Sequence, residues 1–351
     1  MKTKMISSGQ WAGILLVSRL AASVTFAPLF GNSTDLWSAL LYGLTLLIVL
    51  LPSIWLNRRT GGSNILRQAR AWNPWLGKGV AAALALYCLY VLTVGVMQFM
   101  AFVRESLSPD MSAAALCVAL MAAAFWAAWY GIEAIARTVL PIAVLLVGSV
   151  LAVVILLVPE MKSGYLTDAF LASATASGWL SETVRTTEIA VSGLLLSHTA
   201  APRTFRSAVW PSLGVAGLIF LIRLSVTATF GRFAEGQLYP YHTAVTVIDV
   251  GSFRRADLLV VAIWIAAIFV RMTVFAWAFS HCVHTCVRRP IRRWIVPLGV
   301  VAATVIGIFG RISPTEGVNW WLIGISLGGI LLFAVIGPLV FLMCKKGESI
   351  S

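Results

Sequence analysis

About ten runs of predominantly apolar residues, each roughly twenty residues long, recur along this sequence between charged residues, glycines and prolines. A helix needs about 20 apolar residues to cross the hydrocarbon core of a bilayer. Charged residues make up only 11% of the chain, and a soluble protein this apolar would expose patches large enough to aggregate. The sequence therefore predicts an all-α polytopic membrane protein, with a single transmembrane domain over residues 1–351.

The boundaries of the predicted helices follow from the flanking charges, glycines and prolines. The first apolar run lacks the small-residue cleavage site of a signal peptide, so we expect it to remain as the first helix. The ten helices are expected at residues 9–30, 36–56, 79–103, 112–130, 136–158, 183–203, 207–230, 256–283, 294–310 and 319–343.

The basic residues predict the orientation of these helices. With the N-terminus inside, inner segments hold sixteen of the 26 Lys and Arg residues and outer segments hold six. Because cytoplasmic loops are enriched in Lys and Arg, this bias predicts cytoplasmic N- and C-termini and an even number of helices. The net charge of +13 has the same explanation, and the short basic loops do not indicate nucleic-acid binding.

Five predicted helices precede residue 159 and five follow residue 182. This division is typical of an inverted-repeat transporter, with a first repeat at about 9–158 and a second at about 183–343. A five-plus-five bundle of another kind also fits. The two long outer loops, 159–182 and 231–255, are expected to hold a short surface helix or a partner contact.

Glu188 is the only acidic residue well inside a predicted helix, and at 1.5 Å per residue it lies roughly 7–8 Å from the outer end. Ser192 and Gly193 follow it and are expected to loosen the helix near mid-membrane, where backbone groups can face a ligand or ion. Glu188 is interpreted as a site for a ligand ammonium group or a proton. Snorkelling, or an ion pair with a neighbouring helix, is the alternative.

Four arginines also fall within predicted helices: Arg19, Arg185, Arg223 and Arg271. Arg19 lies near the middle of the first helix and is expected to bind a carboxylate, or to pair with Glu188 if the first and sixth helices touch. Arg271 follows a long apolar run, which favours a side chain directed into the bundle and a role in charge coupling.

Other candidate residues indicate less chemistry. Tyr87 and Tyr90 share a helical face and are expected either to line a pocket with Trp264 or to pack between helices. The His and Cys residues within 281–286 match no standard zinc spacing, so no metal site is expected. The sequence contains no phosphate-binding loop, nucleophile elbow or clear intramembrane catalytic set, so neither an enzyme nor a cofactor is predicted.

Several short motifs occur in the order and spacing of one known family. Ile-Ser-x-x-Gln is found at residues 6–10 and Asp-x-Trp at residues 35–37. Gly-x-Glu-x-x-x-Arg is found at 131–137, and Tyr-Pro-Tyr at 239–241 precedes Phe-Arg-Arg-Ala-Asp at 253–257. Over nearly its whole length the chain resembles the permease-like B subunit of bacterial spore germinant receptors (GerAB type), within the amino acid–polyamine–organocation superfamily.

The resemblance implies a leucine-transporter-like fold with broken first and sixth helices and a central site between helices one, three, six and eight. It implies A and C receptor subunits as partners, the spore inner membrane as the location, and a role in sensing a nutrient. Family members have glycines at the first-helix break, whereas the alanines of this chain favour continuous helix by about 1 kcal/mol per residue. The site residues that the resemblance implies are Ala21, Ala22, Ser23, Tyr90, Glu188, Ser192, Gly193 and Trp264.

Three functions remain open at this level. The first is a germinant-receptor subunit that binds a small nutrient such as an amino acid and takes part in triggering germination. The second is a secondary transporter for an amino acid or amine, coupled to protons through Glu188 or to another ion. The third is an assembly subunit in which the pocket is vestigial.

Overall fold

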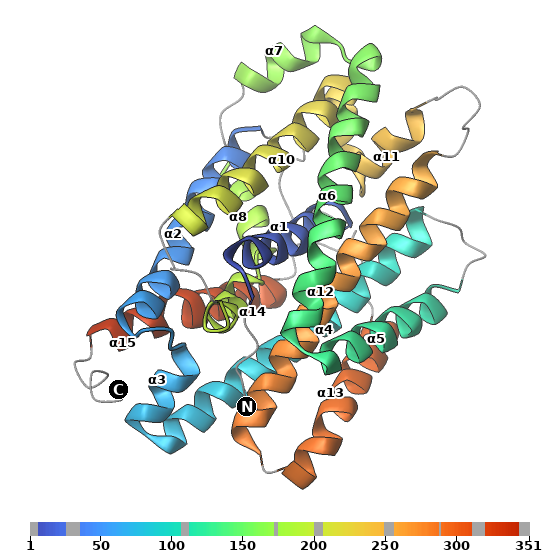
Figure 1. Cartoon of the computed structure of the whole chain (residues 1–351). Helices are drawn as coiled ribbons and strands as arrows, with labels where there is room; N and C mark the ends of the chain where they lie inside the picture. The colour runs from blue at the N-terminus through green and yellow to red at the C-terminus, as the bar shows by residue number, and fades with distance from the viewer. Residues whose placement is uncertain are drawn as a thin grey trace.

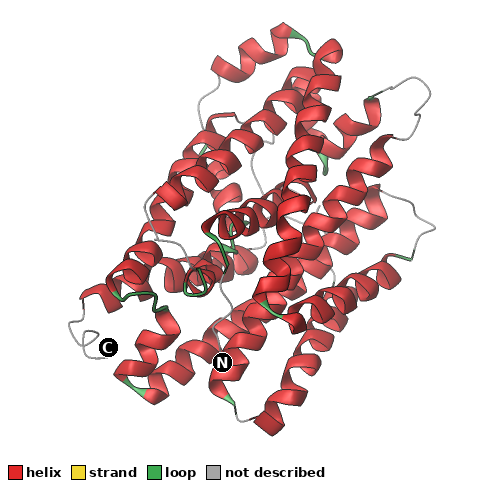
Figure 2. Ribbon diagram, viewed as in Figure 1, coloured by secondary structure: helices red, strands yellow, loops and turns green. Residues whose placement is uncertain are grey.

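The computed structural model describes residues 6–25, 36–106, 112–171, 175–199, 206–248, 256–287, 289–310 and 320–343. Within these ranges the regular elements are helical (Figure 2), and an isolated bridge joins Ile6 to Thr199. The predicted all-α class is therefore confirmed.

The long helices form one bundle in which α4 and α12 run side by side and α1 lies near the centre (Figure 1). α12 also packs against α1, α5 and α6, and α10 packs against α1 and α2. The helices of the bundle are α1 (Ser8–Thr25), α2 (Leu36–Arg59), α4 (Pro74–Ser106), α5 (Ala113–Tyr130), α6 (Ile132–Leu157), α8 (Ala176–Val184), α9 (Ile189–Leu196), α10 (Arg206–Phe230), α12 (Ala256–Cys286), α13 (Arg289–Phe309), α14 (Trp320–Ile330) and α15 (Gly337–Met343).

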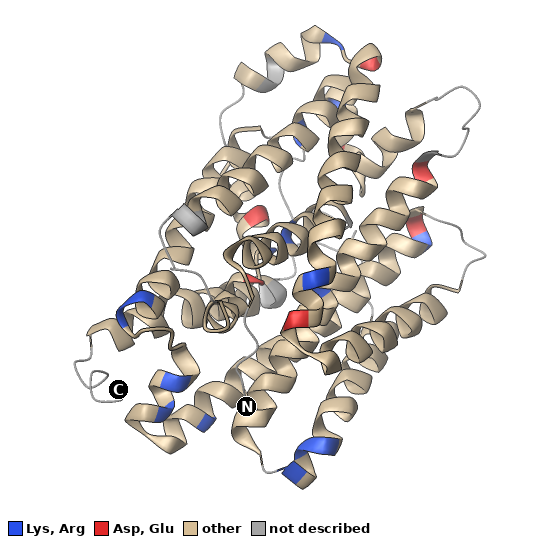
Figure 3. Ribbon diagram, viewed as in Figure 1, with Lys and Arg blue, Asp and Glu red and all other residues tan. Residues whose placement is uncertain are grey.

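Eight helical segments of the described chain are long and apolar enough to cross a membrane. The first predicted span is not among these eight because α1 is less apolar than the others, with Gln10, Ser18 and Arg19 in its sequence. The sixth is not among them because it is divided into α8 and α9. In the ribbon of Figure 3 most charged residues are found toward the ends of the bundle, and a few are in its middle. This distribution agrees with a protein that has lipid around its middle.

Short elements connect the long ones. Both long outer loops contain a short helix, α7 (Ser163–Leu171) and α11 (Pro240–Val247), with the 3₁₀ segments η1 (Val158–Glu160) and η2 (Gly231–Gly236) beside them. α7 is an exposed surface helix, as expected, whereas four of the eight residues of α11 are buried. The sequence did not predict α3 (Ile65–Trp72), which begins where the Asn64 side chain accepts a hydrogen bond from the Arg67 amide. The tenth predicted helix contains a π-helical segment, η3 (Leu331–Ile336), between α14 and α15.

Gly131 explains the sharp turn between α5 and α6. Its φ is 93°, a backbone conformation that L side chains rarely adopt, and its amide donates to the Ala128 carbonyl at 3.1 Å. Two residues later, Glu133 forms an exposed i,i+4 ion pair with Arg137. The Gly-x-Glu-x-x-x-Arg motif therefore ends one helix and begins the next.

Candidate ligand-binding site

The sixth helix is broken, and the break carries the buried charges of the site. The predicted range 183–203 starts too late, because α8 begins at Ala176. The break in the sixth helix that the resemblance implied is confirmed, because α8 ends at Val184 and α9 begins at Ile189. The earlier start has a local cause, since the Thr175 hydroxyl caps α8 by accepting a hydrogen bond from the Gly178 amide at 3.1 Å. Glu188 thus lies about 18 Å beyond the start of α8 rather than about 7–8 Å.

The turn between α8 and α9 keeps its backbone hydrogen-bonded. The amides of Ile189, Ala190 and Val191 donate to the carbonyls three residues earlier, each at 3.2 Å, instead of four residues earlier. Threonine hydroxyls compete for helix carbonyls at the same place, because Thr186 Oγ1 donates to the Glu182 carbonyl at 2.9 Å. The break therefore lies before Glu188, and the expected loosening at Ser192 and Gly193 is not observed, since both are within α9.

Glu182 is the centre of a buried cluster of ionic groups. Its carboxylate contacts Arg19 from α1, accepts a hydrogen bond from Arg223 Nη2 of α10 at 2.5 Å, and lies 3.9 Å from Arg185 Nη1. Arg19 Nε also donates to the Tyr42 hydroxyl at 2.8 Å, which links α2 to the cluster. One carboxylate thus joins α1, α8 and α10.

Glu188 has a different partner and a simpler environment. Arg271 Nη1 of α12 donates to Glu188 Oε2 at 2.7 Å and to the Ser18 carbonyl of α1 at 3.0 Å. Its Nη2 donates to Thr187 Oγ1 at 2.6 Å and to the Arg185 carbonyl at 3.4 Å. A single guanidinium therefore connects α12, α1 and the helix break.

The predicted pairing of Arg19 with Glu188 is wrong, because Arg19 pairs with Glu182 and Arg271 pairs with Glu188. The predicted loop over 159–182 hid Glu182, which is only 3% exposed. A sequence signal for it existed in its spacing, since Glu182 and Arg185 are three residues apart and lie on one helical face.

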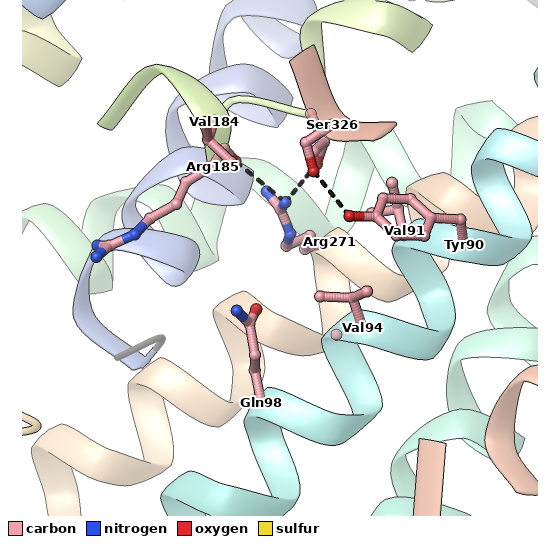
Figure 4. A pocket seen from close by; sticks show the side chains of 10 residues that line it. Tyr90, Val91, Val94, Gln98, Val184, Arg185, Arg271 and Ser326 are labelled. Carbon is pink, nitrogen blue, oxygen red and sulfur yellow. Dashed lines mark hydrogen bonds between the residues drawn. The ribbon is translucent and has the colours of Figure 1, made fainter. Parts of the chain in front are cut away.

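A small cavity lies next to Arg271, between α4, the helix break and α14 (Figure 4). Its volume is about 30 Å³, which is room for about two water molecules. Tyr90 and Gln98 of α4 line it, and the Tyr90 hydroxyl lies 3.0 Å from Ser326 Oγ. In Figure 4 the Arg271, Ser326 and Tyr90 side chains lie next to one another. Thr187 of the break also lines the cavity.

Of the residues that the resemblance implied, only Tyr90 lines this cavity directly. Glu188 adjoins it through Arg271. Ser192 is buried and donates to the Ile189 carbonyl of its own helix at 2.6 Å, and Gly193 faces Ser53 of α2. Gln98 and Ser326 were missed, because single neutral polar residues in apolar helices give little sequence signal.

Trp264 lies on α12, seven residues before Arg271, and so about 10 Å further along that helix. Its ring stacks on Tyr241 of α11 with the centroids 5.0 Å apart, and Trp264 is fully buried. Burial raises the pKa of the Tyr241 hydroxyl, which therefore stays protonated. The expectation that Trp264 lines a pocket with Tyr87 and Tyr90 does not hold for this cavity.

The first helix is continuous where a break was implied. α1 extends from Ser8 to Thr25 and passes through Ala21 and Ala22 without interruption. Both alanines are buried, and Ser23 Oγ donates to the Arg19 carbonyl at 3.3 Å. Alanine stabilises continuous helix relative to glycine, which explains the difference.

The charges of the site are unequal within the described part of the chain. Four buried guanidinium groups (Arg19, Arg185, Arg223 and Arg271) lie around the two carboxylates of Glu182 and Glu188. Charge inside a membrane is costly unless it is paired, so these guanidinium groups favour anionic partners. This arrangement can bind the carboxylate of a small molecule.

The region 281–286 offers no metal site among the residues that are described. The His281 ring packs against His198 and Trp277, each with a centroid distance of 5.4 Å. These rings join the end of α9 to α12 on the side of the bundle where Ile6 N donates to the His198 carbonyl.

Comparison with solved structures shows the same fold. A Na⁺-coupled sialic acid symporter in a substrate-bound outward-open state matches with a TM-score of 0.65 and 12% identity, over 93% of this chain and 79% of that chain. Mhp1, a nucleobase-cation-symport-1 family transporter with bromovinylhydantoin bound, matches with a TM-score of 0.62 and 16% identity, over 96% of this chain and 78% of that chain. MhsT in complex with L-phenylalanine matches with a TM-score of 0.59 and 16% identity, over 98% of this chain and 99% of that chain.

These likenesses confirm the predicted leucine-transporter-like architecture. A comparison with curated protein sequences gives no match. The family model described as spore germination protein matches residues 5–312, which is most of the chain. The chain therefore belongs to the spore germination permease family.

Proposed function

We propose that this protein is the membrane subunit of a spore germinant receptor, and that it binds a small nutrient such as an amino acid beside the break in the sixth helix. The observation that carries the proposal is the Arg271 guanidinium, which contacts α1 and both sides of the break and also lines the cavity. A ligand that contacts Arg271 would change the contacts between three helices. This is what a sensor needs.

The cavity chemistry favours a ligand that has a carboxylate and a modest side chain. Arg185 and Arg271 line the cavity and provide positive charge, and Tyr90, Gln98 and Ser326 provide neutral hydrogen-bonding groups. One of the similar structures is a complex with L-phenylalanine, which supports an amino acid as the first ligand class to test. A cavity of about 30 Å³ is too small for an amino acid, so we expect the cavity to widen when the ligand binds.

The proposed setting follows from the family. As a B subunit the protein would assemble with the A and C subunits of the receptor in the spore inner membrane, with both termini cytoplasmic. Co-expression with A and C receptor subunits from the same organism, followed by affinity purification through this chain, tests that assembly. Recovery of the chain alone would contradict it.

The alternative is a proton- or ion-coupled secondary transporter for an amino acid or amine. One observation favours it: no group among the described residues donates a hydrogen bond to Glu188 Oε1, although this oxygen is buried. A buried carboxylate oxygen without a donor is a candidate for binding a proton. The structural neighbours are transporters by their own descriptions.

The first test measures the melting temperature of the purified protein in detergent against a panel of amino acids, amines and sugars. A ligand that binds only the folded state raises the melting temperature as its concentration rises. We expect an amino acid to do so, and we expect the effect to disappear in Glu188→Gln. The matched control is Glu133→Gln, which makes the same chemical change in an exposed ion pair and should keep the response.

The second test separates a sensor from a carrier. The protein is reconstituted in liposomes, and uptake of the ligand identified above is measured with and without a proton gradient. Binding without uptake supports the receptor, whereas gradient-driven uptake supports the transporter. If no compound in the panel raises the melting temperature although the receptor subunits assemble normally, the result would instead support a subunit with a vestigial pocket.

A further inference from the structure

A second cavity, larger and of different chemistry, lies between α3, the start of α4 and the end of the tenth helix. Its volume is about 390 Å³, and every residue that lines it is apolar. Trp72 of α3 and Leu76 and Gly79 of α4 line it, together with Phe333 and Ile336 of η3 and Phe341 of α15. The Trp72 and Phe341 rings meet edge to face with centroids 5.7 Å apart. We call this cavity the α3 groove.

The α3 groove opens on the outside of the bundle. Trp72, Leu76 and Ile336 are 41–50% exposed, although they are large apolar side chains. No other described segment of the chain covers them. A Cβ atom added to Gly79 would meet nothing within 4 Å, which shows open space along this part of α4. The groove is therefore accessible from the surrounding lipid.

A cluster of cations lies on the helices that form the groove. Arg67 and Arg70 are exposed on α3, and Lys78 is exposed on the first turns of α4, with its Nζ 4.7 Å from the centre of the Trp75 ring. α3 and α4 are in close contact there, since a Cβ on Gly77 would lie 2.8 Å from the Arg70 Cα. In Figure 3 several basic positions are gathered at the corner of the bundle that α3 and the start of α4 form.

The segment of sequence that contains α3 and the start of α4 has no acidic residue to neutralise these cations. The sequence contains no Asp or Glu between Asp35 and Glu105, whereas Arg58 and Arg59 add two further exposed cations at the end of α2. Basic pockets between membrane helices bind anionic lipid headgroups, with about 1 kcal/mol per basic residue. An apolar groove whose helices carry several cations therefore matches a molecule that has an acyl chain and a phosphate.

We propose that the α3 groove is a binding site for one anionic phospholipid, with an acyl chain along Gly79 and the phosphate on the Arg70 and Lys78 side chains. A partner helix would fill the apolar groove equally well, but it would leave the adjoining cations without a function. The proposal is independent of the nutrient site, because no residue lines both cavities.

The test uses the purified full-length protein with phosphatidylglycerol or phosphatidylcholine as the added lipid. We expect phosphatidylglycerol to raise the melting temperature with concentration and phosphatidylcholine to have a much smaller effect. Gly79→Leu fills the groove and should abolish the phosphatidylglycerol effect. The control is Gly148→Leu on α6, where an added Cβ also meets nothing within 4 Å, and this variant should behave as the wild type.

A second pair of variants tests the charges. Arg70→Gln and Lys78→Gln should each weaken phosphatidylglycerol binding about fivefold in a native mass-spectrometry titration. Arg289→Gln and Arg293→Gln, which remove exposed cations of α13, should leave binding unchanged. Equal effects of the two lipids would overturn the proposal, as expected of an uncharged acyl chain or a partner helix in the groove. A phosphatidylglycerol effect that survives Gly79→Leu would also overturn it.

If Gly79→Leu does not fold, Ala83→Phe, which fills the same groove one turn further along α4, replaces it with the same expected outcomes.

Discussion

Glu182 and Glu188 lie six residues apart on either side of the same break, yet their surroundings differ. Glu182 contacts three arginines that come from α1, α8 and α10. Glu188 has one arginine partner, leaves one oxygen without a hydrogen-bond donor among the described residues, and adjoins the cavity. We infer that the two carboxylates have different roles. Glu182 stabilises the packing of the helices, and Glu188 is the candidate for binding a ligand or a proton.

The largest expected effect is the loss of the Glu182 carboxylate. Glu182→Gln leaves three buried guanidinium groups without their shared anion, and breaking a buried ion pair costs about 3–5 kcal/mol. We expect a large fall in the yield of folded protein and in the melting temperature in detergent. A melting temperature equal to that of the wild type would show that Glu182 does not hold the helices together.

Glu188→Gln should have a smaller effect on stability and a larger one on function. Arg271 keeps the Ser18 carbonyl, the Thr187 hydroxyl and the Arg185 carbonyl as acceptors, so we expect a loss of about 1–3 kcal/mol. The nutrient response, measured as germination of spores that carry the variant, should be abolished while the protein remains in the membrane. A normal germination response would show that the charge of Glu188 is not needed for sensing the nutrient.

Tyr90→Phe should have a modest effect, limited to the cavity. It removes the hydroxyl that lies 3.0 Å from Ser326 Oγ, a hydrogen bond with a net contribution of about 1 kcal/mol. We expect the ligand concentration for half-maximal response to rise about fivefold, with the melting temperature of the ligand-free protein nearly unchanged. An unchanged half-maximal concentration would place the ligand away from α4.

Gly193→Ala is expected to have the smallest effect. The added Cβ would lie 3.6 Å from Ser53 Oγ, an ordinary contact, and alanine stabilises a helix interior by about 1 kcal/mol relative to glycine. Stability should stay the same or rise slightly, as monitored by thermal denaturation. If the variant is stable but fails to respond to nutrient, the helix must also open at Gly193 during signalling, and the break before Glu188 is then only part of the moving region.

Apolar periodicity and flanking charge predicted the long helices well, because a membrane span needs a long uninterrupted run. The same reasoning failed at residues 176–184, where the polar Ser181, Glu182 and Thr183 resemble a loop although they are buried among arginines. Burial of a charge depends on partners from distant helices, and a single sequence does not show which helices touch. A single sequence therefore could not decide whether Glu182 or Glu188 is the partner of Arg19.

The ligand residues show the same limit. Tyr90 and Arg271 were identified as candidates, and both line the cavity, whereas Ala21, Ala22 and Ser23 followed from a family pattern of a first-helix break that this chain does not show at these residues. The two alanines already indicated an unbroken helix at these positions, because alanine favours continuous helix. The π-helical segment and the α3 helix had no comparable signal.

The surroundings of Arg271 have a consequence for energetics. Broken helices of membrane carriers use unwound carbonyls and nearby oxygens to coordinate sodium ions or protons. Here two backbone carbonyls, one hydroxyl and one carboxylate already surround a guanidinium, at distances of 2.6–3.4 Å. The positive charge at this position is attached to the chain and cannot leave down a concentration gradient. A sodium ion at this position would have to displace a tethered competitor, so sodium binding here is an unfavourable source of free energy for rearranging these helices.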